Sequence, residues 1–446
     1  METKTWKNVE FENVFVNRKK DRIIGLTFPA SNKNLGLEPS ILSVLPPDKE
    51  CEYSMENIDF NDDDVQYYVC SVYIAGMDEF KVWAAKHDRN KIIVGGYHPT
   101  MFPEDFKNYA HKIVIGPCDS GGFWETVSPQ TEWDRQMNGP NRNKQQIVNG
   151  ICEHTEVPRY DLFDITFNQQ IIPDKKQDDI CTSINTSIGC PMKCDFCCSP
   201  IMCPKLVSKP IELVERETAL LGSHKPKWLF IRDENFPMQK DWKERLKLIE
   251  KTGAKIYLFS SANYVTEESS KFMAEHNVYM ICLGLENINT EYKKNKNLDK
   301  AVGYLKKYGI YTYLSFIVNP LEIIGQDEGK EYYNRLMKRF FELKPEMVTG
   351  NFLMPFRGTA LWDQYYAYVS ESDYKDYDSK SAFLVKNDVL RKKMEFYLFY
   401  YQWMYYTSDE YRLIRNFTCN DTLHARFEEL CKEFRVKYER LWNVRA

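Results

Sequence analysis

The sequence lacks several features that mark whole classes of protein. It has no uninterrupted stretch of about 18 apolar residues, so we expect no membrane span. It has no basic excess, because 60 Lys and Arg are set against 64 Asp and Glu, and a net charge of −4 argues against a general nucleic-acid surface. The first residues, Met1 to Lys7, have no apolar core of a secretory signal. These absences favour a cytoplasmic protein without membrane or nucleic-acid partners.

The composition is otherwise that of an ordinary globular protein. Apolar residues make up 43% and charged residues 28% of the chain, and 446 residues predict two or three domains. The 13 cysteines are odd in number and lie mostly in apolar runs. This usage fits a reducing cytoplasm better than a disulfide framework.

Three cysteines in one short loop, Cys190, Cys194 and Cys197, carry the clearest chemical signal. Their spacing is C-x3-C-x2-C, and Phe196 directly precedes the last one. Three thiolates this close do not suit an ordinary disulfide pattern, and tetrahedral zinc would want a fourth ligand at comparable spacing. Cysteine thiolates are the ligands of a [4Fe–4S] cluster, and three of them would leave one iron open for a substrate or cofactor. Buried structural cysteines or a zinc knuckle are the alternatives.

This spacing resembles the signature of the radical SAM superfamily. Its members bind S-adenosylmethionine (SAM) at the fourth iron of a [4Fe–4S] cluster and cleave it reductively. The resemblance implies that Cys190, Cys194 and Cys197 bind the cluster. One departure is Ile188, where relatives often have arginine before the Gly-Cys pair.

Apolar strands and helical stretches alternate over the first 120 residues. We expect strands at 23–27, 65–72, 92–94 and 113–115, with helical character at 77–87 and 103–109. This alternation predicts a doubly wound, Rossmann-like parallel sheet, whose ligands bind at the carboxyl ends of the strands. One such end carries Gly95 and Gly96, and paired glycines let backbone approach a large flat ligand closely.

The run Val-Gly-Gly-Tyr-His-Pro-Thr at 94–100 resembles a strand end of the cobalamin-binding domain that precedes many radical SAM cores. The resemblance implies cobalamin contacts at Thr27, Tyr73, Ile74, Gly95, Gly96, His98 and Thr100. None of the 7 histidines lies in a D-x-H-x-x-G sequence, so nothing suggests a histidine below the cobalt. The sequence Gly-Pro-Cys-Asp at 116–119 replaces the acidic Gly-Glu-Gly-Glu often found in relatives. A domain that keeps this fold without binding cobalamin is the alternative.

After a polar stretch at 131–150, typical of a surface linker, strand and helix alternate six times. We expect strands near 181–188, 227–232, 255–261, 278–284, 310–318 and 346–353, with helices at 210–221, 241–252, 269–276, 298–308 and 329–343. This repeat predicts an α/β core in which a parallel sheet curls into part of a barrel, with functional groups at the carboxyl ends of its strands. Radical SAM cores are six-stranded partial (β/α)6 barrels of this kind.

Acidic residues follow two of these strands. The segment Phe-Ile-Arg-Asp-Glu-Asn-Phe at 230–236 resembles an acidic segment of cobalamin-type radical SAM enzymes. It implies that Asp233 and Glu234 support the methionyl ammonium of SAM, which needs carboxylate or carbonyl acceptors. Glu286 lies in a segment similar to the family's G-x-E-S sequence, with Asn287 in place of serine, and would contact the ammonium or the ribose. A solvated helix cap is the alternative for the first segment.

The C-terminal part of the chain, 380–446, is expected to be helical. The stretch from Phe396 to Tyr406 has eight aromatics in eleven positions, which favours a helix packed against the barrel. Tyrosines that line the barrel mouth are the alternative. We therefore expect a cobalamin-binding-like domain with its linker at 1–150, a radical SAM core at 151–370 and a helical region at 371–446.

Together these resemblances imply a cobalamin-dependent radical SAM methyltransferase that acts on an unactivated carbon. In that family, cleavage of SAM yields a 5′-deoxyadenosyl radical that removes hydrogen from the substrate, and methylcobalamin then delivers a methyl group. The expected substrate is a peptide or protein side chain or a small molecule, and the expected electron donor is a flavodoxin or ferredoxin.

The rival interpretation keeps the radical without methyl transfer, as in an epimerase, cyclase or other rearrangement enzyme. An epimerase would need a hydrogen donor, for which Cys198, Cys203 or Cys282 would serve. A methylthiotransferase is disfavoured because no second cysteine triad is evident. A purely structural cluster would leave the acidic strand ends without a role.

Overall fold

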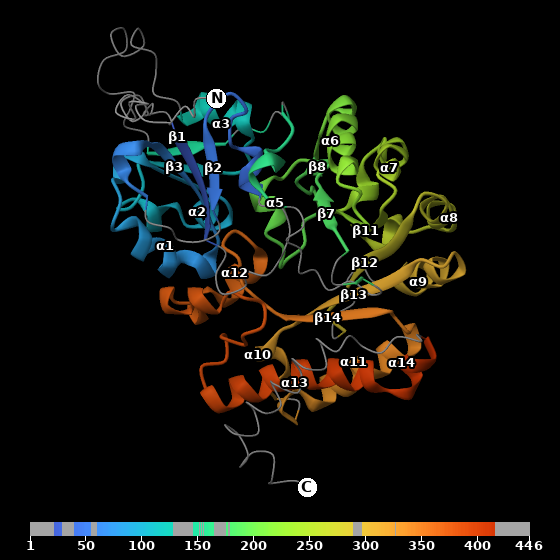
Figure 1. Ribbon diagram of the computed structural model, residues 1–446. Coiled ribbons are helices and arrows are strands. Elements are labelled where there is room, and N and C mark those ends of the chain that lie inside the picture. Colours follow the sequence, from blue (N-terminus) through green and yellow to red (C-terminus); the bar gives the residue numbers. More distant parts are fainter. Residues whose placement is uncertain are drawn as a thin grey trace, which may run out of the picture. The chain divides into compact units, whose positions relative to one another are not determined.

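The computed structural model describes residues 22–28, 40–54, 60–127, 146–150, 152, 154, 156–164, 175–176, 179–288, 297–325 and 327–414 (Figure 1). The described residues up to Phe163 form one compact unit, and those from Asp164 onward form a second. Each unit contains a six-stranded parallel sheet. Among the described helices, none combines the length and the apolar character needed to cross a membrane.

The sheet of the first unit has the strand order β2-β1-β3-β4-β5-β6, and all its described pairs are parallel. Its strands are β1 (Arg22–Phe28), β2 (Cys51–Ser54), β3 (Val65–Val72), β4 (Ile92–Gly95), β5 (Lys112–Ile115) and β6 (Ile147–Asn149). The predicted doubly wound sheet is confirmed. Its strand order reverses between β1 and β3, and such a reversal point is where open parallel sheets bind their ligands.

The helices of this unit are α1 (Met77–Ala84), α2 (Tyr97–Met101) and α3 (Ser120–Val127), joined by short 3-10 turns such as η4 (Ile74–Gly76) and η6 (Pro103–Phe106). Phe28, Phe80 and Trp83 pack their rings together, and Val69, Ile93 and Val114 belong to another buried cluster. The sequence did not predict β2 and β6, and β6 lies inside the stretch that we expected to be linker. Both are short edge strands with half-exposed residues, so neither has the apolar run of a central strand.

The sheet of the second unit runs β14-β13-β12-β11-β10-β7, again entirely parallel. Its strands are β7 (Cys181–Ile184), β10 (Trp228–Ile231), β11 (Lys255–Ser260), β12 (Val278–Glu286), β13 (Tyr311–Val318) and β14 (Met347–Phe352). Each strand pairs with the strand before and after it in this series, which is the topology of the predicted partial barrel. The expected strand at 181–188 is divided, because β8 (Ser187–Ile188) leaves the sheet to pair with β9 (Val207–Ser208).

Helices connect these strands and cover the outer face of the curved sheet, as α6 to α9 do in Figure 1. The described helices of this unit are α5 (Ser199–Met202), α6 (Ile211–Ser223), α7 (Trp242–Glu250), α8 (Glu267–Glu275), α9 (Leu298–Lys307), α10 (Pro320–Ile323), α11 (Lys330–Leu343), and, after the last strand, α12 (Ala360–Tyr365), α13 (Asp388–Thr407) and α14 (Asp409–Ile414). The amphipathic helix α9, for example, buries Leu298, Ala301, Val302 and Leu305 at helical spacing.

The aromatic helix α13 covers the edge strand β14. The Val348 N–H donates to the Tyr406 hydroxyl over 2.7 Å, and that hydroxyl donates to the Val348 carbonyl over 2.9 Å. The Gly350 N–H donates to Gln402 Oε1, and Lys380 Nζ donates to the Gly350 carbonyl. An uncovered edge strand would offer these groups to another chain. The preferred interpretation of the aromatic run, a helix packed against the barrel, agrees with these contacts.

Tyr406→Phe should destabilise the second unit while keeping the ring that packs there. The change leaves two buried backbone groups of Val348 without their partner, at a cost of about 1–3 kcal/mol each. The thermal midpoint should therefore fall by several degrees, at about 2–4 °C for each kcal/mol in a unit of this size. Tyr366→Phe, which removes a hydroxyl from a residue that is 59% exposed, is the control and should change nothing. Equal midpoints for the two variants would contradict this account.

Candidate active site

A cavity of about 420 Å³ lies at the carboxyl ends of the strands of the partial barrel. This volume is within the range of about 300–1,000 Å³ that small-molecule sites occupy. The lining comes from the cysteine loop, through Cys190 and Phe196, and from the ends of five strands, through Glu234, Ser261, Glu286, Ile317 and Asn351 among others. Loops at the carboxyl ends of parallel barrel strands carry the functional groups of such folds. The structure therefore brings the cysteine loop and two of the three predicted acidic residues to one cavity.

The cysteine loop begins at a glycine that no other residue can replace without strain. Gly189 has φ +82°, and a Cβ at this position would lie 2.1 Å from the Lys205 carbonyl oxygen and 2.7 Å from Cys203 Sγ. The Cys190 N–H donates to the Cys203 carbonyl over 3.1 Å. This hydrogen bond joins the first cysteine of the loop to the segment that follows the loop. This close approach of two backbone segments fixes where Cys190 meets the cavity.

The three thiols of the loop affect one another electrostatically. Burial raises the pKa of Cys190, and the neighbouring Cys197, Glu234 and Cys194 raise it further. Burial also raises the pKa of Cys197, with Ser199 acting in the opposite direction as a hydrogen-bond partner. Three soft sulfur donors on one loop, with Cys190 open to a cavity, form the donor set of a [4Fe–4S] cluster that keeps one iron accessible. The residues present therefore fit that group.

Asp233 takes a different position from the one expected of a SAM contact. Its side chain is fully buried and does not line the cavity. One oxygen accepts from the Thr186 N–H over 2.6 Å, and the other accepts from the Thr186 hydroxyl over 2.5 Å, from the Ser187 hydroxyl over 2.8 Å and from Gln239 Nε2 over 2.8 Å. Burial raises the pKa of Asp233, although these hydrogen bonds act to lower it. Asp233 joins the strand that leads into the cysteine loop to the end of β10, and it is a positioning residue.

Glu234, the next residue, does reach the cavity. Its side chain is exposed and lines the cavity beside Asn235, whose Oδ1 accepts from the Ser261 N–H over 3.2 Å. The two neighbouring acidic residues of the predicted segment therefore do different things, because successive side chains after β10 point into and away from the protein core. Glu234 therefore places a carboxylate at the cavity.

Glu286 is aimed at the cavity by an irregularity of β12. The register of β12 against β13 shifts between Gly284 and Glu286, and Glu286 has φ +54°, a conformation that non-glycine residues rarely adopt. Strand irregularities of this kind re-aim side chains next to active sites. A Cβ on Gly284 would lie 2.2 Å from Glu286 Oε1, so the carboxylate folds back over a position that only glycine leaves open. Asn287, the next residue, donates to Glu322 Oε2 over 3.1 Å.

The predicted cobalamin contacts gather at one edge of the first unit's sheet. Thr27, the penultimate residue of β1, is in register with Ser71 of β3, and Ser71 is in register with Gly95 of β4. Gly96 has φ +103°, and a Cβ there would lie 3.2 Å from the Ser71 hydroxyl oxygen. Tyr73 follows β3 and is 37% exposed. Small residues and one exposed ring at the point where the strand order reverses fit a large planar ligand.

Three other predicted contacts are engaged within the unit. The Thr100 hydroxyl donates to the Gly96 carbonyl over 2.7 Å and accepts from the Gly116 N–H over 3.0 Å, so it holds the glycine turn. Ile74 is 4% exposed, and His98 is fully buried, with its Nε2 2.9 Å from Asp105 Oδ2. These two side chains are buried in the core of the unit, so their assignment as cobalamin contacts stays a prediction. Apolar residues around the His98 ring explain its place better than a ligand does.

A parallel partial barrel with a three-cysteine loop and a carboxylate-lined cavity at its strand ends is the arrangement expected from the radical SAM resemblance. No protein-family model matches the sequence. Two solved structures of the radical SAM methyltransferase TsrM from Kitasatospora setae have TM-scores of 0.54 at 12% identity and cover 78% of this chain. One of these structures holds cobalamin and a [4Fe–4S] cluster, and the match covers 78% of its chain. The other holds tryptophan substrate and the SAM analogue aza-SAM, and the match covers 76% of its chain.

Two curated proteins of Chlorobaculum tepidum are also similar. Bacteriochlorophyllide d C-12(1)-methyltransferase is 22% identical over 309 residues, 66% of this chain, and the match spans 64% of that protein's length. Bacteriochlorophyllide d C-8(2)-methyltransferase is 22% identical over 355 residues, 73% of this chain and 74% of that protein. The chain shares the fold of a cobalamin-binding radical SAM methyltransferase, and the family resemblance predicted from the sequence is confirmed.

Sequence reasoning missed the contribution of the third barrel strand. Phe259, Ser260, Ser261 and Ala262, at the end of β11 and just after it, line the cavity, as does Ser315 of β13. The available signal was a pair of small polar residues directly after an apolar strand. It was weak, because serine is equally common where a strand simply turns.

Asp233→Asn should lower the iron content of the protein. The Asp233 carboxylate accepts four hydrogen bonds, and the amide of asparagine replaces one of its two acceptor oxygens with a donor group. Buried donors without an acceptor cost about 1–3 kcal/mol each, so the loop that leads into the cysteines should loosen. Glu234→Gln is the matched control, and it should keep full iron while weakening SAM binding. The measurements are iron per chain after anaerobic reconstitution and SAM affinity by calorimetry. Full iron with weakened SAM binding in Asp233→Asn would restore a direct SAM role for this residue.

Gly284→Ala should displace the Glu286 carboxylate without unfolding the protein, since the clash is with the end of a flexible side chain. If that carboxylate accepts a charge-assisted hydrogen bond from SAM, its loss costs about 1.5–3 kcal/mol, or roughly tenfold or more in affinity. Glu286→Gln should show the same loss. Gly303→Ala, where a Cβ meets nothing within 4 Å, is the control. Unchanged SAM affinity in both Gly284→Ala and Glu286→Gln would end the assignment.

Proposed function

We propose that this protein is a cobalamin-dependent radical SAM methyltransferase that methylates an unactivated carbon. The observation that carries the proposal is the placement of Cys190, Glu234 and Glu286 around one cavity of a parallel partial barrel. The sheet topology of the first unit and the methyltransferase activities named for the similar proteins support it.

In this proposal the cavity binds SAM beside the cysteine loop. Cys190, Cys194 and Cys197 would hold a [4Fe–4S] cluster, and the carboxylates of Glu234 and Glu286 suit the ammonium of the methionyl group. When bound, the cluster would supply the electron for SAM cleavage, and cobalamin would carry the methyl group. The protein's own residues would position these groups at the cavity.

The edge of the first unit would hold cobalamin through Thr27, Tyr73, Gly95, Gly96 and Thr100. The backbone turn at the two glycines allows close approach, and Thr100 stiffens that turn. His98 is buried with its Nε2 beside Asp105, which supports cobalamin bound without a ligand from this histidine.

We further propose a small molecule or a peptide side chain as substrate, and a flavodoxin or ferredoxin as electron donor. A cavity of about 420 Å³ is shared between SAM and the reacting part of the substrate, which favours insertion of a compact group. Tryptophan is the substrate in one of the similar structures.

One observation favours a second candidate, an epimerase or related rearrangement enzyme. The Cys282 side chain lines the cavity next to Gly284 and Glu286, where a thiol could donate hydrogen to a substrate radical. Of the three cysteines expected to serve this role, Cys198 and Cys203 do not line the cavity. Solvent deuterium in the product, lost on Cys282→Ala, would identify that activity.

The two candidates separate on the fate of the SAM methyl group. The reconstituted full-length protein is loaded with hydroxocobalamin, chemically reduced and given SAM that carries a deuterated methyl group. The methyltransferase proposal predicts transfer of that methyl group to protein-bound cobalamin, detected by mass spectrometry. Gly96→Leu should abolish cobalamin retention and methyl transfer while the [4Fe–4S] absorbance persists, because the bulky side chain occupies the strand edge and φ +103° disfavours it. Reductive SAM cleavage by a protein that retains no cobalamin would favour the second candidate.

A further inference from the structure

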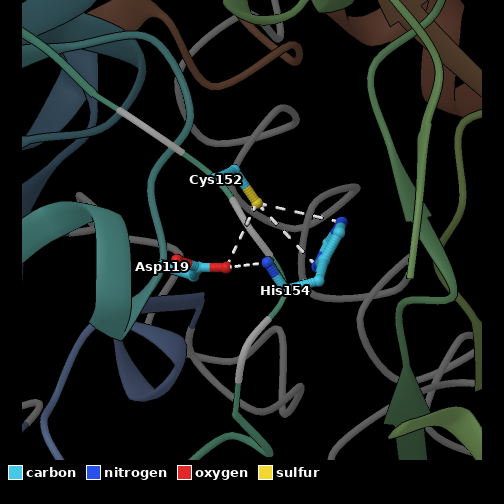
Figure 2. Close-up of side chains that lie close together, drawn as sticks. All are labelled: Asp119, Cys152 and His154. Carbon is cyan, nitrogen blue, oxygen red and sulfur yellow. Dashed lines mark hydrogen bonds between the residues drawn. The ribbon is translucent and has the colours of Figure 1, made fainter. Parts of the chain in front are cut away.

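Three side chains with metal-binding atoms meet in the first unit, which does not contain the three-cysteine loop. Asp119 follows β5, and Cys152 and His154 follow β6, so the carboxyl ends of two paired strands bring them together. Their candidate ligand atoms all lie within 4.8 Å of one another. Cys152 Sγ is 3.7 Å from Asp119 Oδ2 and 3.8 Å from each ring nitrogen of His154, and Figure 2 shows the sulfur between the two.

These separations are those of ligands around one small metal ion. Tetrahedral zinc, with bonds of about 2.3 Å to sulfur and about 2.0–2.2 Å to nitrogen or oxygen, holds neighbouring ligand atoms roughly 3.5 Å apart. Thiolate, imidazole and carboxylate are all zinc ligands, and the mixture of soft and borderline donors disfavours magnesium or calcium. A rotation of the His154 ring that turns one nitrogen toward Cys152 and Asp119, with small closing movements, would complete the coordination.

The surrounding backbone is built to keep these groups together. Asp119 is 5% and His154 9% exposed, and the His154 N–H donates to Asp119 Oδ2. His154 has φ +51°, a left-handed conformation that costs energy in a non-glycine residue and clusters at ligand sites. A Cβ on Gly150 would lie 2.6 Å from the Pro117 carbonyl oxygen, so the segment after β6 is closely packed on the segment after β5.

A nucleophilic cysteine is the other reading of the same three residues, and the geometry does not suit it. Asp119 bonds the backbone N–H of His154, and this bond does not orient the ring for proton transfer.

We propose that Asp119, Cys152 and His154 bind one zinc ion, with Cys118 or water as the fourth ligand, and that this ion clamps the chain leaving β6 to the end of β5. Cys118 is next to Asp119 and close enough to Cys152 to influence it electrostatically. The site is independent of the proposed methyltransferase chemistry. A metal bound only by the folded unit stabilises that unit by mass action.

The test uses full-length protein with Cys190, Cys194 and Cys197 all changed to Ala, because the cysteine loop would itself take up zinc. The protein is stripped with a chelator, dialysed against zinc and analysed for zinc per chain. We expect one equivalent, lost when Cys152→Ser or His154→Gln is added. Cys51→Ser, which removes another half-buried thiol of the same unit, is the matched control and should retain it. Cobalt in place of zinc should give the visible bands of a tetrahedral thiolate site.

Two measurements guard against a misfolded variant. The circular dichroism spectra of Cys152→Ser and Cys51→Ser should match. Zinc should raise the thermal midpoint of Cys51→Ser and leave that of Cys152→Ser unchanged. In the cluster-loaded wild type, one zinc should accompany the four irons. Substoichiometric zinc in every protein, zinc that persists in Cys152→Ser, or a thiol titration that reveals a Cys118–Cys152 disulfide would each overturn the proposal.

Discussion

The buried carboxylate of Asp233 is the interaction on which the candidate active site depends. It accepts hydrogen bonds from Thr186 and Ser187, directly ahead of the cysteine loop, and from Gln239, beyond the end of β10. Arg245 strengthens the same junction, because its guanidinium donates to the Thr186 carbonyl over 3.3 Å. A fully buried carboxylate is costly unless its oxygens are satisfied, so this arrangement has essentially one stable form. The loop that carries the cysteines and the loop that carries Glu234 are thereby held in one relative position.

The remaining geometry follows from parallel strand pairing. Parallel strands put all their carboxyl ends at one edge, and every strand from β10 to β14 contributes residues to the cavity there. The bulge before Glu286 and the open space at Gly284 turn a carboxylate inward at that edge. At one edge of the sheet, α13 covers β14, so the backbone groups of this edge strand are not offered to another chain. Rigid strands thus support a site made largely of loops.

Much of this could be predicted from the sequence, because central strands and amphipathic helices have strong apolar periodicity. All six core strands were predicted within a few residues, whereas the short edge strands β2 and β6 were not. Residue roles were harder to assign. Asp233 and Glu234 are adjacent and chemically alike, and only the direction of each side chain separates a buried anchor from a cavity residue. His98 stands in a glycine-rich segment that resembles a ligand site, yet its burial depends on aromatic residues that follow it.

Residues that meet only through the fold leave no pattern of spacing in the sequence. Asp119 and His154 are 35 positions apart and come together because β5 and β6 pair. The three cysteines of the loop could be recognised for the opposite reason, since their whole ligand set lies within eight residues. A ligand set within one loop could therefore be predicted from the sequence, whereas a ligand set brought together by strand pairing required the structure.

The central claim is that SAM binds in the cavity with its methionyl group at the iron left open by Cys190, Cys194 and Cys197. Electron–nuclear double resonance on the reduced, reconstituted protein with 15N-labelled SAM tests it most directly. We predict a hyperfine coupling between the reduced cluster and the methionyl nitrogen, and its loss in Glu286→Gln if that carboxylate helps to hold the methionyl group in place. A reduced [4Fe–4S] cluster that shows no coupling to labelled SAM in the wild-type protein would contradict the account.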